Sequence, residues 1–244
     1  MRAPSSLILA TLIALSFSCA RRTSEPVVAK PPAAVPAAIV LVSGDKQVST
    51  IGTPLDQPVV VQVNNSQGAP VAGATVRFRG ANGTVFQPAS GVAGSDGQFT
   101  FSVALGSLAG RYQIAASTTG AGGKTIEVRI PELALGFEEN KGRELSDAYC
   151  VRCHDPESTA LRVSNHDNLV AKSHSFDDGA FLNKVSDADL LAIISHGGPG
   201  IGKSAEMPPY EHTLSKSDIA ALVAYIRAVA DPPYQSGEAV YAQR

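Results

Sequence analysis

The apolar residues between positions 38 and 130 come in short runs that are separated by turn-forming residues. Residues 74–79 show the clearest alternation, with Val76 and Phe78 on one expected face and polar residues on the other. The intervening segments are rich in Gly, Asn, Asp and Ser, which favour turns. Many short strands at this spacing are typical of an all-β sandwich. We expect strands over residues 38–42, 59–63, 74–79, 98–103, 112–116 and 125–130.

From residue 138 onward the apolar positions recur at helical spacing. The clearest case lies near the C-terminus, where Leu222 and Ile226 are four residues apart. This helix is preceded by Ser215 and Asp218, whose spacing predicts a capping box. Three helices are expected: one over residues 138–150, one from Ser186 to the glycines at 197–200, and one from Ser215 to the prolines at 232–233.

These two patterns divide the chain into an all-β domain followed by an all-α domain, and 244 residues have room for both and a leader. The formal net charge of −2 conceals an asymmetry. Residues 38–130 carry 6 Lys+Arg against 4 Asp+Glu, whereas residues 138–234 carry 9 against 15. An acidic second domain fits either a solvated surface or a basic protein partner. No basic, aromatic-rich segment indicates nucleic-acid binding. The expected boundaries are 1–18 for a signal peptide, 19–37 for a linker, 38–130 for the β domain, 131–137 for a connector, 138–234 for the α domain and 235–244 for a tail.

The N-terminus is typical of an export signal, with Arg2 followed by an apolar run over residues 7–17. That run is about half of the ~20 residues that a membrane-spanning helix needs. Residues 15–19 resemble a bacterial lipoprotein signal, which implies that Cys19 is acylated and becomes the new N-terminus. The alternative is ordinary cleavage near Ser18, which would leave Cys19 unpaired in an oxidising compartment.

The residues after Cys19 bear on location. Residue 20 is Ala and not Asp, which by resemblance to Gram-negative lipoproteins favours the outer membrane. The segment 19–37 is rich in Pro and Ala, so we expect an extended tether. We therefore expect an exported protein held at the periplasmic face of a bacterial membrane, with the outer membrane favoured, or at the cell surface.

Residues 150–154 have the sequence Cys-Val-Arg-Cys-His. A C-x-x-C pair followed directly by histidine indicates covalent attachment of haem c. Cys150 and Cys153 would each add to one haem vinyl group, and His154 would lie under the iron as its axial ligand. The alternatives are a thioredoxin-like redox pair and half of a zinc site. A redox pair needs a βαβ context that the sequence lacks, and a zinc site needs a fourth ligand as well placed as Met207 is for iron.

The C-terminal domain resembles class I cytochromes c. The resemblance is carried by the cysteine–histidine motif, by Gly142 eight residues before it, and by Tyr225 in the expected last helix. It implies that Gly142 lets the first helix cross closely over the last one, opposite Tyr225. The family usually has a proline whose carbonyl accepts the N–H of the axial histidine. That stretch is not matched here, so the partner of His154 stays open.

Residues 206–210, Glu-Met-Pro-Pro-Tyr, add to this resemblance and imply that Met207 is the second axial ligand. A thioether is a soft ligand that stabilises ferrous haem, and the two prolines would stiffen its loop. The alternative is that Met207 only fills a gap in the core. His174 or His212 would then be the fallback ligand.

Residues 67–78 resemble the bacterial Ig-like domain of invasin/intimin type, as do Ser-Asp-Gly at 95–97 and Gly-Arg-Tyr at 110–112. The resemblance implies an Ig-like sandwich in which Tyr112 forms a tyrosine corner. Such sandwiches serve many unrelated roles. No cluster of His, Cys or acidic residues marks a site here, so we expect a spacer or docking module.

Together these patterns predict a membrane-tethered cytochrome with one haem c, which carries single electrons between redox protein partners. An electron carrier is expected rather than an enzyme, because two axial protein ligands leave no open iron position. Two alternatives stay open. One is a haem-bearing subunit or domain of an extracytoplasmic oxidoreductase, and the other is an Ig-like adhesion or scaffold protein with a haem sensor.

Overall fold

A computed structural model describes residues 34–81 and 83–235. The expected signal peptide, Cys19 and nearly all of the expected tail lie outside the described residues. Within the described part, no helix has both the length and the apolar character needed to cross a bilayer.

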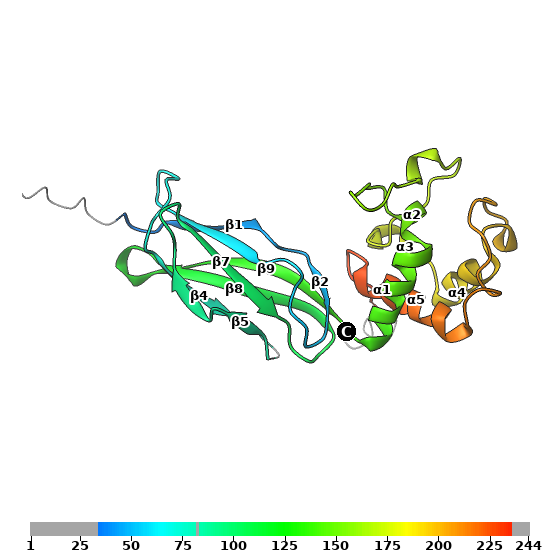
Figure 1. Ribbon diagram of the computed structural model, residues 1–244, viewed down its shortest axis with the longest axis horizontal. Coiled ribbons are helices and arrows are strands. Elements are labelled where there is room, and N and C mark those ends of the chain that lie inside the picture. Colours follow the sequence, from blue (N-terminus) through cyan, green and yellow to red (C-terminus); the bar gives the residue numbers. More distant parts are fainter. Residues whose placement is uncertain (1–33, 82, 236–244) are drawn as a thin grey trace, which may run out of the picture. The chain divides into compact units, whose positions relative to one another are not determined.

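The N-terminal part is a β-sandwich of two sheets (Figure 1). One sheet has the strand order β1-β3-β7-β5, and the other has the order β2-β9-β8-β4-β6. The paired strands are antiparallel except for β2 and β9, which are parallel. The strands are β1 (Ala38–Ser43), β2 (Val48–Thr50), β3 (Val59–Asn64), β4 (Thr75–Arg79), β5 (Val85–Gln87), β6 (Ser90–Val92), β7 (Gln98–Ala104), β8 (Gly110–Thr119) and β9 (Thr125–Leu135).

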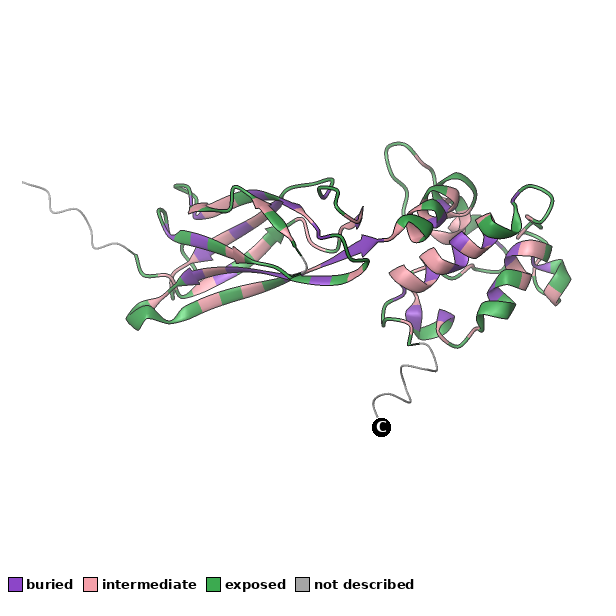
Figure 2. Ribbon diagram, turned by 90° about the horizontal axis from the view of Figure 1, so that it is seen from below, coloured by how far each residue is buried: buried purple, intermediate pink, exposed green. Residues whose placement is uncertain are grey.

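The core of the sandwich follows from alternation along its strands, which Figure 2 shows as alternating buried and exposed segments. In β3, Val59, Val61 and Val63 are fully buried and the residues between them are partly exposed. Tyr112 is buried and donates its hydroxyl hydrogen to the carbonyl oxygen of Leu108 at 2.8 Å. This bond confirms the tyrosine corner, in which a buried phenol fixes the loop before its own strand.

The strands differ from the expectation at two places. The strands β2, β5 and β6 were not expected, because three residues are too few to show an alternating pattern. The last strand continues through Leu135, so residues 131–135 are strand rather than connector. Pro131 has no N–H to donate, but its carbonyl oxygen accepts the N–H of Lys46 at 2.8 Å. Beyond it, β2 pairs with β9 from Leu133 onward and prolongs the sheet.

The C-terminal part is helical, as expected. Ser186 caps the fourth helix through the N–H of Asp189, and Ser215 and Asp218 form the predicted capping box of the fifth. Leu222 and Ile226 of the fifth helix are buried in the core of this part. The helices are α1 (Phe137–Tyr149), α2 (Val151–His154), α3 (Gly179–Leu182), α4 (Asp187–His196) and α5 (Lys216–Val229).

The helices α1 and α5 cross at Gly142. A Cβ atom on Gly142 would overlap the backbone of Ala221 and would lie 2.7 Å from the Cβ atom of Tyr225. This arrangement confirms the close crossing that the sequence predicted. It also positions the site, because the cysteine motif follows directly at the end of α1.

Candidate functional site

The cysteine motif lies at the junction between α1 and α2. Cys150 is the C-terminal cap of α1, and Cys153 and His154 belong to α2. The backbone N–H groups of Cys153 and His154 both donate to the carbonyl oxygen of Cys150 at 3.0 Å. This single turn places the two thiols three residues apart on one face, where both border the same cavity.

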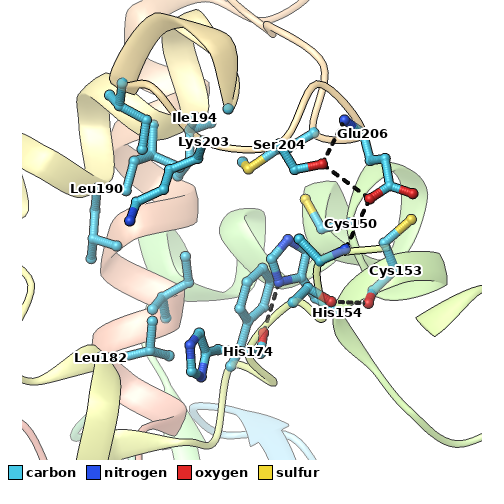
Figure 3. A pocket seen from close by; sticks show the side chains of 18 of the residues that line it. Cys150, Cys153, His154, His174, Leu182, Leu190, Ile194, Lys203, Ser204 and Glu206 are labelled. Atoms are coloured by element: carbon cyan, nitrogen blue, oxygen red, sulfur yellow. Dashed lines mark hydrogen bonds between the residues drawn. The ribbon is translucent and has the colours of Figure 1, made fainter. Parts of the chain in front are cut away.

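That cavity has a volume of about 470 Å³, which is within the range of small-molecule and cofactor sites. Figure 3 shows Cys150 and Cys153 on one side of it and Leu182 and Leu190 across from them. His154 and Met207 also border the cavity. The structure therefore brings the four predicted haem-binding residues to one apolar cavity, although they are up to 57 positions apart in the numbering of the chain.

His154 is held by the backbone of His174. The Nδ1 atom of His154 lies 2.8 Å from the carbonyl oxygen of His174. A carbonyl can only accept, so Nδ1 carries the hydrogen and Nε2 is left as the nitrogen that can bind a metal. The imidazole also stacks on Phe176, with ring centroids 4.7 Å apart. Burial lowers the pKa of His154, which favours the neutral form that ligates metals.

The residue before His174 strengthens this arrangement. The hydroxyl of Ser173 donates to the carbonyl oxygen of Cys153. The segment 173–174 is thus bonded to α2 through both a side chain and a backbone carbonyl. The sequence did not identify His174 in this role, because any residue can supply a backbone carbonyl and only the path of the chain decides which one does.

Met207 lies in the loop after α4. Its carbonyl oxygen accepts the N–H of Gly198 at 3.0 Å, and its side chain packs against the helical core. Gly197 has a φ of 67° and faces the carbonyl of Met207, where a Cβ would lie 2.6 Å from the oxygen. At the end of the loop, the Tyr210 hydroxyl donates to the carbonyl oxygen of Tyr149 at 3.0 Å. The loop is therefore anchored at both of its ends.

The Cys150 thiol does not have the lowered pKa that is typical of a redox-active cysteine. Burial, together with smaller contributions from the neighbouring Cys153 and Asp147, raises the pKa of Cys150 to about 12. Catalytic and redox-active thiols instead have a pKa below the ordinary value. Within the described residues, no group of three or more His, Cys, Asp and Glu side chains is arranged to hold a metal ion.

The other histidines differ in their access to the cavity. The ring of His174 borders it, stacks on Phe181 with centroids 3.5 Å apart, and faces the carboxylate of Asp178 at 3.0 Å. The side chain of His212 is 85% exposed, near Glu211. His196, at the end of α4, pairs with the same glutamate at 3.2 Å. Of the two fallback ligands, His174 is therefore the one that borders the cavity.

These residues fit haem c. The site offers two cysteine thiols, a neutral imidazole with Nε2 free, a thioether and an apolar cavity, which are the groups that covalent attachment and two-ligand iron binding need. Leu182, Leu190 and Ile194 supply apolar walls that exclude water.

Comparison with protein families agrees with this geometry. Residues 138–226 match the family model described as cytochrome C oxidase, cbb3-type, subunit III. This part of the chain thus matches a cytochrome c domain, and that family implies covalently bound haem c. No curated protein sequence matches the chain.

Solved structures similar to the chain include an adhesin and a domain of intimin. Adhesin InvE of Yersinia pseudotuberculosis is 15% identical, with a TM-score of 0.32 over 40% of this chain and 32% of that one. The D00-D0 domain of intimin is 16% identical, with a TM-score of 0.31 over 43% of this chain and 51% of that one. The chain therefore spans about a third and about half of these two structures.

Proposed function

We propose that this protein is a c-type cytochrome with one haem, which transfers single electrons between protein partners outside the cytoplasmic membrane. The match to a cytochrome c domain supports a haem-bearing electron-transfer protein in general. The observation that carries the finer proposal is that Cys150, Cys153, His154 and Met207 all border one apolar cavity.

In this proposal each residue has one role. The thiols of Cys150 and Cys153 would form the thioether links to the haem, and Nε2 of His154 and the sulfur of Met207 would bind its iron. The bound haem supplies an iron that accepts or releases one electron. The His174 carbonyl fixes the ring orientation of His154, and the anchored loop fixes Met207. Because the His154 ring and the Met207 loop are already held in place, a one-electron change at the iron would need little rearrangement of the protein.

The acidic helical domain supports a basic partner. Residues 138–234 carry 15 Asp+Glu against 9 Lys+Arg, and redox partners meet through small interfaces that charge steers. The leader and Cys19 support export and a lipid tether at the periplasmic face of a membrane or at the cell surface. The sandwich is then a spacer or docking module between tether and haem domain.

A second candidate function follows from the description of the matched family. That description names a subunit of an oxidase, which favours a haem-bearing subunit of a larger oxidoreductase. Both candidates use the same four residues, and they differ in whether the protein acts as a free carrier or within a stable complex.

The test is to express the full chain in a bacterium that matures c-type cytochromes, beside the Cys150→Ser/Cys153→Ser variant. Haem that resists acid–acetone extraction from the wild type but not from the variant supports covalent attachment at these thiols.

In a second test, carbon monoxide is added to the reduced wild-type protein. Failure to bind it supports two axial protein ligands and an electron carrier, whereas rapid binding would indicate an open iron position and contradict the proposal. Membrane extracts run on a sizing column separate a free carrier from a subunit of a stable complex.

A further inference from the structure

One short segment contacts His154, the first expected iron ligand, and Glu206, the residue next to the second, Met207. It comprises residues 169–174 and is called the strap below. At its C-terminal end the strap is bonded to α2, since Ser173 donates to the carbonyl of Cys153 and the carbonyl of His174 accepts from His154. At its N-terminal end it meets the loop that carries Met207, and the contact there is made by Glu206.

The carboxylate of Glu206 gathers several donors at once. It accepts the backbone N–H of Val170 at 3.1 Å and that of Ala171 at 3.2 Å. It also accepts the hydroxyl of Ser204 at 3.0 Å, while that hydroxyl's oxygen accepts the N–H of Glu206. Figure 3 shows Glu206 and Ser204 bonded to each other at the edge of the cavity.

We propose that Glu206 is a positioning residue, whose carboxylate fastens the Met207 loop to the strap so that one segment holds both axial ligands in place. This inference rests on the proposed function. Glu206 precedes Met207 directly in the chain, so any movement of its backbone is passed to the thioether. The strap passes the constraint on to His154 through the His174 carbonyl.

The charge and the shape of the side chain suit this role. An ionised carboxylate has two oxygens that only accept hydrogen bonds, and bonds to a charged acceptor are stronger than neutral ones. Glutamine has the same length, but one of its two terminal groups donates and cannot accept from an N–H. The Glu206→Gln variant therefore loses part of the clamp without opening a cavity.

The chain offers a matched control in Glu211, four residues further along. Its carboxylate faces His196 and His212 and makes no hydrogen bond to the strap among the described residues. Glu211→Gln removes the same charge from the same region, so a general effect of charge on the haem would be equal in the two variants. A positioning effect would be confined to Glu206→Gln.

The experiment uses the oxidised holoprotein and imidazole, a small ligand that competes with the methionine for the iron. We expect Glu206→Gln to raise the apparent affinity for imidazole about 5- to 30-fold, because the loop opens more easily without its charged bonds. Glu211→Gln should stay within about twofold of the wild type. Unchanged affinity in Glu206→Gln, or an equal change in both variants, would overturn the proposal.

A second measurement needs no variant. Val170 is 94% exposed, so its amide hydrogen would exchange rapidly with solvent if nothing bonded it. The proposal predicts slow exchange at Val170 and Ala171 in the wild-type holoprotein, and fast exchange at both positions overturns it.

If the wild type lacks a sulfur–iron absorption band, the role of Met207 fails and this inference fails with it. If the band is present but the clamp tests fail, only the inference on Glu206 falls.

Discussion

Gly142 of α1 lies against the backbone of Ala221 in α5, and there is no room between them for a side-chain carbon. In an exposed helix, replacing glycine with alanine stabilises by about 1 kcal/mol. Here the added methyl group would push the two helices apart. We expect Gly142→Ala to lower the free energy of unfolding of the helical domain by about 1–3 kcal/mol. Urea unfolding followed by haem absorbance measures this, and a stabilised variant would contradict the close crossing.

Tyr210 anchors the end of the Met207 loop through its hydroxyl bond to the Tyr149 carbonyl. Burial raises the pKa of Tyr210 to about 12, so the phenol keeps its hydrogen at neutral pH. We expect Tyr210→Phe to lower the free energy of unfolding of the haem domain by about 1 kcal/mol. Tyr149→Phe is the control, because the Tyr149 hydroxyl makes no hydrogen bond within the described residues. Equal urea midpoints for the two variants would argue against this anchor.

Glu132 in β9 is 3% exposed, and burial raises its pKa from 4.5 to about 8. Its Oε2 atom accepts the N–H of Gln47 at 2.7 Å, while Oε1 has no hydrogen-bond partner among the described residues. The folded state therefore favours the protonated acid. The contribution of the Glu132 side chain to the free energy of unfolding is complete below pH 4.5 and is lost as the pH rises through 8.

From this we expect the stability of the wild type, relative to Glu132→Gln, to fall by on the order of 2–4 kcal/mol between pH 4.5 and pH 9. Glutamine keeps an acceptor for Gln47 and cannot ionise. Urea unfolding followed by far-UV circular dichroism across this pH range provides the measurement. Parallel pH profiles for the two proteins would show that Glu132 is not buried as described.

Tyr112 provides a test of the sandwich. Removing its hydroxyl in Tyr112→Phe leaves the buried ring in place but leaves the Leu108 carbonyl without its partner. The expected loss is about 1 kcal/mol of unfolding free energy. The far-UV transition in urea should move to lower concentration, while the haem spectrum stays the same. An unchanged transition would mean that the corner does not stabilise the strand.

Much of this architecture could be predicted from the sequence because it depends on local patterns. Alternation in the strands, the capping box at Ser215 and the spacing of the cysteine motif are each contained in a few consecutive residues. Gly142 and Tyr225 were paired correctly through a family resemblance, which supplied the long-range contact that no local pattern could supply.

The parts that were missed depend on the path of the chain. The carbonyl that holds His154 belongs to His174, twenty residues away, and a backbone carbonyl leaves no mark in a sequence. Glu206 has the appearance of an ordinary exposed acid until its contacts with Val170 and Ala171 are seen. The sequence predicted that strand β9 ends before Pro131. The strand continues to Leu135, because its pairing with β2 outweighs the signal of one proline.

The central claim is that His154 and Met207 together ligate the iron of a covalently bound haem. The most direct test is the visible spectrum of the oxidised full-length protein, matured in a competent host, beside that of Met207→Ala. The account predicts a weak far-red sulfur–iron band in the wild type that is absent from Met207→Ala, with haem still covalently bound in both. Covalent haem without such a band in the wild type, and an identical spectrum in Met207→Ala, would contradict it.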